Sequence, residues 1–208
     1  MPNRWIVALK FIVFPLCLAP LGMLVYRGVT ANLGPDPVAT ITHRTGFWAL
    51  YLLLASLAIT PLRRLHKRLA WLIRFRRMLG LFAFFYACLH LATYVWLFSA
   101  FDVQSMLDDV LKRRFITVGF LAWLTLLALA ATSTTWAIRK LGGKRWTWLH
   151  RSVYAAAMLG VLHYWWIVKS GVRTPWRVTA VLTILLLARV AWSAKESVRK
   201  KRITAAAV

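Results

Sequence analysis

Acidic side chains are scarce in this sequence of 208 residues. Five Asp and Glu stand against 28 Lys and Arg, which gives a formal charge of +23. No acid lies inside an apolar block, which argues against a proton-coupled pump or transporter, because proton relays need intramembrane ionisable groups. In a soluble protein a pI near 11.6 would suggest nucleic-acid binding. That interpretation is disfavoured because the basic residues lie between apolar blocks long enough to cross a bilayer.

Several motifs are absent as well. There is no G-x-G-x-x-G or phosphate-loop pattern, and the connections between apolar blocks are short, so no nucleotide-binding domain is expected. The lack of C-x-x-C-H excludes a covalently attached haem of the c type. Cys17 and Cys88 both fall within apolar blocks, which argues against a structural disulfide or zinc site.

Long hydrophobic runs dominate what remains. Hydrophobic residues make up 61% of the chain, and the mean hydropathy is +0.63. About 20 helical residues cross a hydrocarbon core of about 30 Å, and only helices satisfy their own backbone polar groups there. The sequence therefore predicts an all-α integral membrane protein, a single domain over residues 1–208 with six transmembrane helices. We expect these helices at about 8–26, 44–61, 77–99, 115–133, 147–168 and 175–193.

The basic residues predict the orientation of this bundle. Segment 62–77 carries seven Lys and Arg, segment 134–151 carries five, and the tail 194–208 carries five. Lys and Arg concentrate on the cytoplasmic side of membrane proteins. We therefore expect both termini in the cytoplasm, with residues 194–208 as a basic cytoplasmic tail.

Two histidines are the deep titratable groups of the predicted bundle. His90 lies about 13 residues beyond Arg77, and His163 lies about 15 residues beyond Trp148, which places both imidazoles about 20–22 Å from the cytoplasmic side. Two neutral imidazoles from facing helices, one on each side of the iron, are the axial ligands of a b-type haem. The alternative is that each histidine only hydrogen-bonds a neighbouring helix.

Neighbouring residues fit the haem hypothesis. Ala87, Ala156 and Gly160 are small and lie near the two histidines along their helices, where they would leave room for a porphyrin. His43 is expected at the outer interface, with a propionate or quinone contact as the alternative. Three outer cations would meet haem propionates: Arg44, Lys169 and Arg173.

His150 is harder to assign. It precedes His163 by 13 residues, a spacing that suits a second haem beneath the first but turns an ideal helix by about 220°, away from a shared face. The matching positions before His90, residues 76–77, are both arginine, so an inner haem would need His66 as its second ligand. An interfacial or supporting role for His150 is equally open.

Several stretches resemble one known family. They are HRTGFWAL (43–50), RRMLGLFAFFYACLHLATY (76–94), KRRFITVGFLAWL (112–124), LAATSTTW (129–136) and WTWLHRSVYAAAMLGVLHYWW (146–166). Together they resemble the MsrQ (YedZ) family of haem-binding membrane subunits of a bacterial methionine sulfoxide reductase system. That family belongs to the ferric-reductase-like transmembrane group, alongside eukaryotic NADPH oxidases.

The resemblance implies a b-type cytochrome of the bacterial inner membrane. Such a subunit passes electrons to a periplasmic molybdopterin-containing reductase that repairs oxidised methionines, and receives them from the quinone pool or a cytosolic flavin reductase. It also implies FMN, for which no motif is evident, and haem-associated roles for His90, His150 and His163. The chain lacks the fourth histidine that the wider oxidase group has on the third helix. The number of haems, one or two, therefore stays open.

Two other functions are compatible with the sequence. A self-contained membrane ferric or quinone reductase would turn over as the purified chain alone, although no nucleotide domain is evident. A non-redox assembly factor or transporter would purify without colour. The relay has no substrate-transforming site of its own, so we expect no catalytic residues in the chain.

Overall fold

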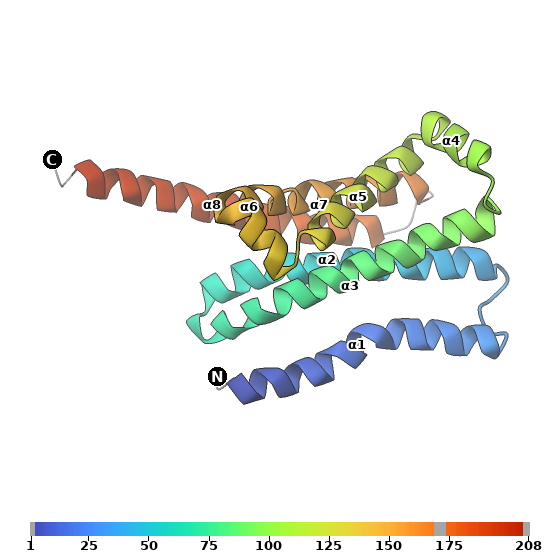
Figure 1. The fold of residues 1–208 in the computed structure, drawn as a ribbon, viewed down its shortest axis with the longest axis horizontal. Helices are drawn as coiled ribbons and strands as arrows, with labels where there is room; N and C mark the ends of the chain where they lie inside the picture. The colour runs from blue at the N-terminus through green and yellow to red at the C-terminus, as the bar shows by residue number, and fades with distance from the viewer. Residues whose placement is uncertain (1–2, 169–173, 206–208) are drawn as a thin grey trace.

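In the computed structural model, residues 3–168 and 174–205 are described, and all their regular elements are helices (Figure 1). The predicted all-α class is thereby confirmed. In chain order the elements are α1 (Asn3–Val29), α2 (Pro37–Leu65), η1 (Lys67–Leu72), α3 (Ile73–Thr93), η2 (Tyr94–Phe98), α4 (Val103–Lys112), α5 (Arg114–Ala131), α6 (Thr135–His150), α7 (Val153–Ile167) and α8 (Thr174–Ala205). The short element η1 is a 3-10 helix, and η2 is a π-helix that continues α3.

Five helical segments of the described chain are long and apolar enough to cross a membrane. They are Arg4–Val29, Pro37–Leu65, Lys67–Phe98, Arg114–Ala131 and Pro175–Arg199. The predicted helix at 147–168 does not form as one piece. It breaks at turn residues 151–152, and α7 has only 15 residues. Judged by length and composition, the described chain therefore has five candidate membrane-spanning helices where six were predicted.

Three further features differ from the predicted helix limits. α4 and α6 are helices in segments expected to be connections, and α8 continues to Ala205 through the predicted tail. The Asp102 carboxylate begins α4 by accepting from two backbone N–H groups. Lys112 lies 2.6 Å from the Asp108 carboxylate, and this charged hydrogen bond lowers the pKa of Asp108. α4 is thus a short capped helix with an ion pair at the end of the molecule away from α6.

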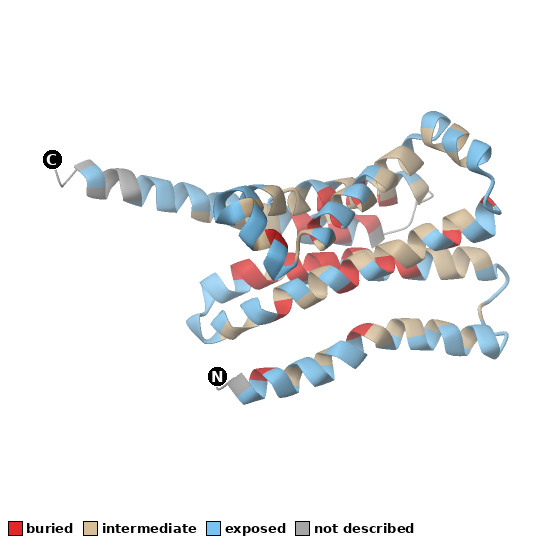
Figure 2. Ribbon diagram, in the orientation of Figure 1, coloured by how far each residue is buried: buried red, intermediate tan, exposed pale blue. Residues whose placement is uncertain are grey.

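α2 lies at the centre of the packing. It packs along α3 and also contacts α7 and α8, while α5 packs along α7. Its middle is the most buried part of the molecule, whereas α1 is largely exposed (Figure 2). The Ser56 hydroxyl donates to the Arg76 carbonyl at 3.0 Å, and the Thr42 hydroxyl donates to that of Thr93 at 3.2 Å. These bonds join α2 to α3 near both ends of their interface.

A side chain of α3 interrupts the backbone hydrogen bonds of α1. The Leu21 N–H donates to the Tyr86 hydroxyl at 3.1 Å, and that hydroxyl donates to the Cys17 carbonyl at 2.8 Å. The hydroxyl thus bridges a donor and an acceptor that would bond each other in an undisturbed helix. Pro15 and Pro20 lie beside the break and remove two further backbone donors. Prolines and inserted side chains are the usual causes of kinks, and α1 bends midway (Figure 1).

Replacement of Tyr86 by phenylalanine is expected to lower the free energy of unfolding by about 1–3 kcal/mol, because it leaves Leu21 N–H and Cys17 C=O without their bridge. Chemical unfolding in detergent micelles measures the change. Tyr26→Phe is the matched control, since Tyr26 is 64% exposed on the same helix. Equal losses in the two variants would contradict a bridging role.

Candidate functional site

The site is built on two histidines from separate helices. His90 comes from α3 and His163 from α7. Their ring centroids lie 5.9 Å apart, with the ring planes at 83°. A metal–imidazole bond of about 2 Å, added to about 1 Å from nitrogen to ring centre, gives roughly 6 Å for two imidazoles on one metal ion. The observed separation of 5.9 Å matches that of two imidazoles bound to one metal ion.

Backbone carbonyls fix the proton on each imidazole. His90 Nδ1 lies 2.9 Å from the Thr42 carbonyl oxygen of α2, and His163 Nδ1 lies 2.7 Å from the Phe115 carbonyl oxygen of α5. A carbonyl can only accept, so each Nδ1 carries the hydrogen and donates it. In a neutral ring this leaves the Nε2 lone pair available, and metal-bound histidines are oriented by the same kind of bond.

Two glycines make room for these rings. A Cβ on Gly46 of α2 would lie 3.1 Å from His90 Nδ1, and a Cβ on Gly119 of α5 would lie 2.6 Å from His163 Nδ1. The second distance is shorter than any ordinary contact, so the imidazole of His163 can lie there only because residue 119 has no side chain. Sequence reasoning missed both glycines, although each occurs before a phenylalanine inside an apolar block.

The two halves of the site repeat one arrangement. In both, the histidine follows its carbonyl partner by 48 positions. In both, the glycine lies one helical turn after the residue that supplies the carbonyl. The helix pairs α2–α3 and α5–α7 therefore present one imidazole each in the same way, and the two rings meet between them. This repeat was not predicted from the sequence.

The metal-binding capacity of the site is limited to this pair. In the described part of the chain, no three His, Cys, Asp or Glu side chains gather as ligands for an ion. Two facing imidazoles alone leave most of a coordination sphere unfilled, and a porphyrin supplies the four remaining nitrogens. The ligand set therefore fits a haem better than a free metal ion.

The small residues named from sequence have other neighbours. A Cβ on Gly160 would first meet Leu50 of α2 at 3.5 Å, an ordinary contact. Ala156 is 1% exposed in the hydrophobic core, and Ala87 packs against that core. Gly160 and Ala156 thus allow close packing of α7 within the core, and the rings themselves are accommodated by glycines of α2 and α5.

His150 lies apart from the pair. It ends α6, its ring stacks on Trp146 at 3.9 Å, and its Nε2 lies 3.2 Å from the Thr132 hydroxyl. Trp146 in turn donates to the Thr132 carbonyl at 2.9 Å. His66 lies in the connection after α2, where its Nδ1 accepts from Arg68 N–H. Among the described contacts, none joins His66 to His150.

Two outer residues named from sequence line cavities between α1 and α2. His43 stacks on Phe47 with ring centroids 6.3 Å apart and lines one cavity. Arg44 lines that cavity and a second one beside it. Lys169 and Arg173, the other cations expected near propionates, lie outside the described residues.

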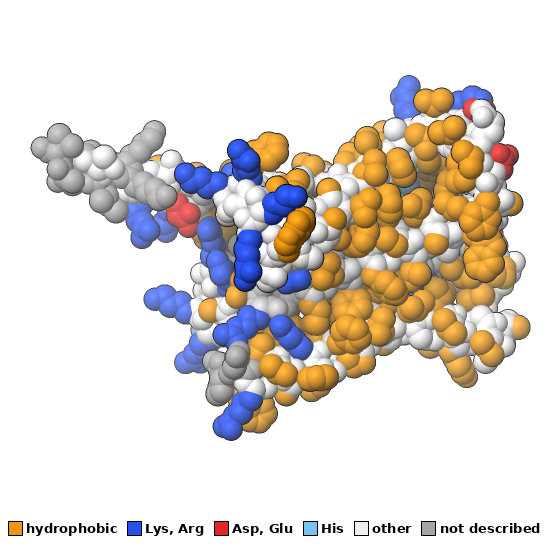
Figure 3. Space-filling model, viewed as in Figure 1, with side chains coloured by type: hydrophobic (Ala, Val, Ile, Leu, Met, Phe, Trp, Pro, Cys, Tyr) orange, Lys and Arg blue, Asp and Glu red, His pale blue; other side chains and the backbone are white. Residues whose placement is uncertain are grey.

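Charge divides the surface into zones (Figure 3). Most Lys and Arg gather at the end where α1 begins and α8 ends, whereas acidic and basic side chains lie together near α4 at the other end. A broad hydrophobic band separates them. Such a band between polar ends is the surface of a protein that crosses a bilayer.

Known proteins resemble this chain closely. Residues 45–161 match the family described as "Ferric reductase like transmembrane component". A protein of Herminiimonas arsenicoxydans is 52% identical over 89% of this chain and 85% of its own length. One from Ralstonia nicotianae is 46% identical over 92% and 89%, and one from Xanthomonas euvesicatoria is 46% identical over 96% and 92%. All three are named protein-methionine-sulfoxide reductase heme-binding subunit MsrQ.

Proposed function

Because the chain belongs to the MsrQ family within the ferric-reductase-like transmembrane group, we propose that it is the haem-binding membrane subunit of a methionine sulfoxide reductase system. Its role is to pass electrons across the membrane to a separate catalytic subunit. The paired imidazoles of His90 and His163 are the observation that carries this proposal.

The chain's own residues prepare the site for haem b. Bound between His90 and His163, a haem would supply reversible one-electron chemistry. The carbonyls of Thr42 and Phe115 hold each ring in the tautomer whose Nε2 can ligate iron. Because four different helices supply the imidazoles and their acceptors, the packing of α2, α3, α5 and α7 sets the positions of the two rings that would hold the haem.

The distribution of Lys and Arg indicates how the chain is oriented in the membrane, and this orientation gives the direction of electron transfer. We propose that the basic end, where α1 begins and α8 ends, faces the cytoplasm of a bacterial inner membrane. α7 would then be a sixth crossing, shorter than the others and shielded by α2, α5 and α8. The histidine pair lies toward the opposite end. Its acceptor would be a periplasmic molybdopterin-containing reductase for oxidised methionines, and its donor the quinone pool or a cytosolic flavin reductase.

We propose one haem at the histidine pair. A second haem on His150 would require that its Nε2 leave Thr132, and its ring face is already covered by Trp146. The resemblance also implies FMN. Both cavities found in the described chain lie between α1 and α2. No cytoplasmic flavin site is assigned to the described residues.

A reduced-minus-oxidised spectrum of the purified chain, with haem quantified per polypeptide, tests the proposal. We expect low-spin b-type bands and about one haem per chain, because one imidazole pair is available. Reoxidation on addition of the catalytic subunit and methionine sulfoxide would then show the relay. A colourless protein, or one reoxidised equally fast without the partner, would contradict it.

A further inference from the structure

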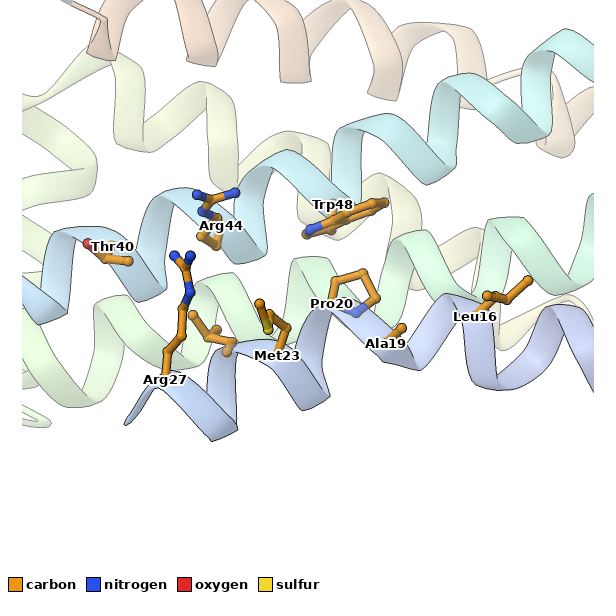
Figure 4. Close-up of a pocket in the computed structure, with 9 residues that line it drawn as sticks. Leu16, Ala19, Pro20, Met23, Arg27, Thr40, Arg44 and Trp48 are labelled. Atoms are coloured by element: carbon orange, nitrogen blue, oxygen red, sulfur yellow. The ribbon is translucent and has the colours of Figure 1, made fainter. Parts of the chain in front are cut away.

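Two adjoining cavities open between α1 and α2, apart from the histidine pair. The larger has a volume of about 360 Å³ and the smaller about 350 Å³. Both are lined by Arg27, Thr40 and Arg44, so they meet at these residues. The larger runs from the middle of α1 to its end and along the start of α2 (Figure 4), and the smaller adjoins it where α1 ends and α2 begins.

The wall of the larger cavity is apolar. Leu16, Ala19, Pro20 and Met23 line it from α1, and Trp48 lines it from α2. These α1 residues surround the break in that helix where the hydroxyl of Tyr86 replaces a backbone hydrogen bond. The crevice therefore runs along α1 beside the kink.

Two cations close the polar end of this crevice. Arg27 projects from α1 and Arg44 from α2, and both line the cavity (Figure 4). The three ion pairs found among the described residues involve other side chains. Asp36 lines the smaller cavity, but its carboxylate accepts from Ala39 N–H as the cap of α2. The guanidinium charges of Arg27 and Arg44 thus have no anionic partner in the described chain.

We propose that this crevice binds one anionic phospholipid of the outer leaflet. The phosphate would lie between Arg27 and Arg44, and one acyl chain would lie along the apolar wall. Guanidinium groups bind phosphate through two parallel hydrogen bonds, and a headgroup without a cation leaves the charge of that phosphate uncompensated for Arg27 and Arg44. The continuous apolar wall favours a lipid over a free anion. This site goes beyond electron transfer, and its existence does not depend on haem binding.

Native mass spectrometry of the purified holoprotein tests the site. Wild type is titrated with phosphatidylglycerol and with phosphatidylcholine of identical acyl chains, and separately with inorganic phosphate. We expect one phosphatidylglycerol to bind at least about tenfold more tightly than phosphatidylcholine. Both lipids offer a phosphate, but the quaternary ammonium of choline brings a cation beside two guanidinium groups that have no anionic partner. The double variant Arg27→Gln/Arg44→Gln should lose this preference. Arg177→Gln, an exposed arginine of α8 outside the cavity, should keep it.

A second variant tests the apolar wall. Ala19→Phe fills the crevice while retaining both arginines, and we expect it to reduce binding of both lipids about tenfold. An equal affinity of wild type for the two lipids would overturn the proposal. So would a preference that survives in the double glutamine variant, or displacement of bound lipid by inorganic phosphate alone. Ala19→Phe keeps Arg44, the arginine expected near haem propionates, so an unchanged haem spectrum in that variant would show that a negative result concerns this site and not the relay.

Discussion

Replacement of His163 by alanine is expected to remove most of the low-spin haem from the purified protein, and His90→Ala is expected to do the same. Each change deletes one of two imidazoles whose rings lie 5.9 Å apart. No other described His, Cys, Asp or Glu gathers with the pair to take the vacant position. Because loss of a supporting group alone weakens metal sites by about 10- to 100-fold, loss of a ligand should cost at least as much. Haem per chain and the reduced spectrum measure it.

His150→Ala is the matched control, since it removes the same side chain from the end of α6. Its ring contacts Trp146 and Thr132 instead of the pair, so most haem should remain. Wild-type haem content in both His90→Ala and His163→Ala would refute the assignment. Loss of haem in His150→Ala equal to that in the other two variants would place a ligand at the inner position.

The sequence predicted long helices best where hydropathy alone decides. α5 lies within two residues of its predicted limits, because lipid-facing and core-facing residues are both apolar there. α2 begins seven residues before its predicted start, and α3 begins four residues early and passes into the π-helix η2 after Thr93. The start of α7 was wrong because the break at residues 151–152 depends on local bonds. The Ser152 hydroxyl donates to the Leu149 carbonyl at 2.7 Å and competes with the helix. α4 was missed because a capped surface helix of ten residues has no long apolar run.

For the site, depth along two helices was enough to pair His90 with His163, because helical rise is regular. Depth could not identify what surrounds the rings. The place of Arg44 in the lining of the cavity between α1 and α2 depends on the rotation of α2, which hydropathy does not specify. Gly46 and Gly119 were missed because a glycine in an apolar block has no distinctive pattern until the neighbouring helix is known. Their significance follows only from contacts between α2 and α3 and between α5 and α7.

Replacement of Gly119 by alanine is expected to disturb haem binding almost as strongly as loss of a ligand. The new methyl group would lie 2.6 Å from Nδ1 and 2.7 Å from Cε1 of His163, well inside van der Waals contact. That Nδ1 donates to Phe115 C=O, one turn before Gly119 on the same helix. The imidazole ring therefore has to tilt. The tilt breaks this hydrogen bond and moves Nε2 from the position in which it would bind iron. Loss of such a supporting bond costs about 10- to 100-fold in affinity.

Gly46→Ala provides a graded comparison on the other half of the repeat. Its methyl group would lie 3.1 Å from the His90 ring, a distance that a shift of a few tenths of an ångström relieves. We therefore expect a changed low-spin electron paramagnetic resonance spectrum with most haem retained. Gly22→Ala on α1 is the control, because its methyl group would meet nothing within 4 Å. If Gly119→Ala matched Gly22→Ala in haem content and spectrum, His163 would have room to ligate without this glycine, and close approach of α5 could not be what positions the imidazole.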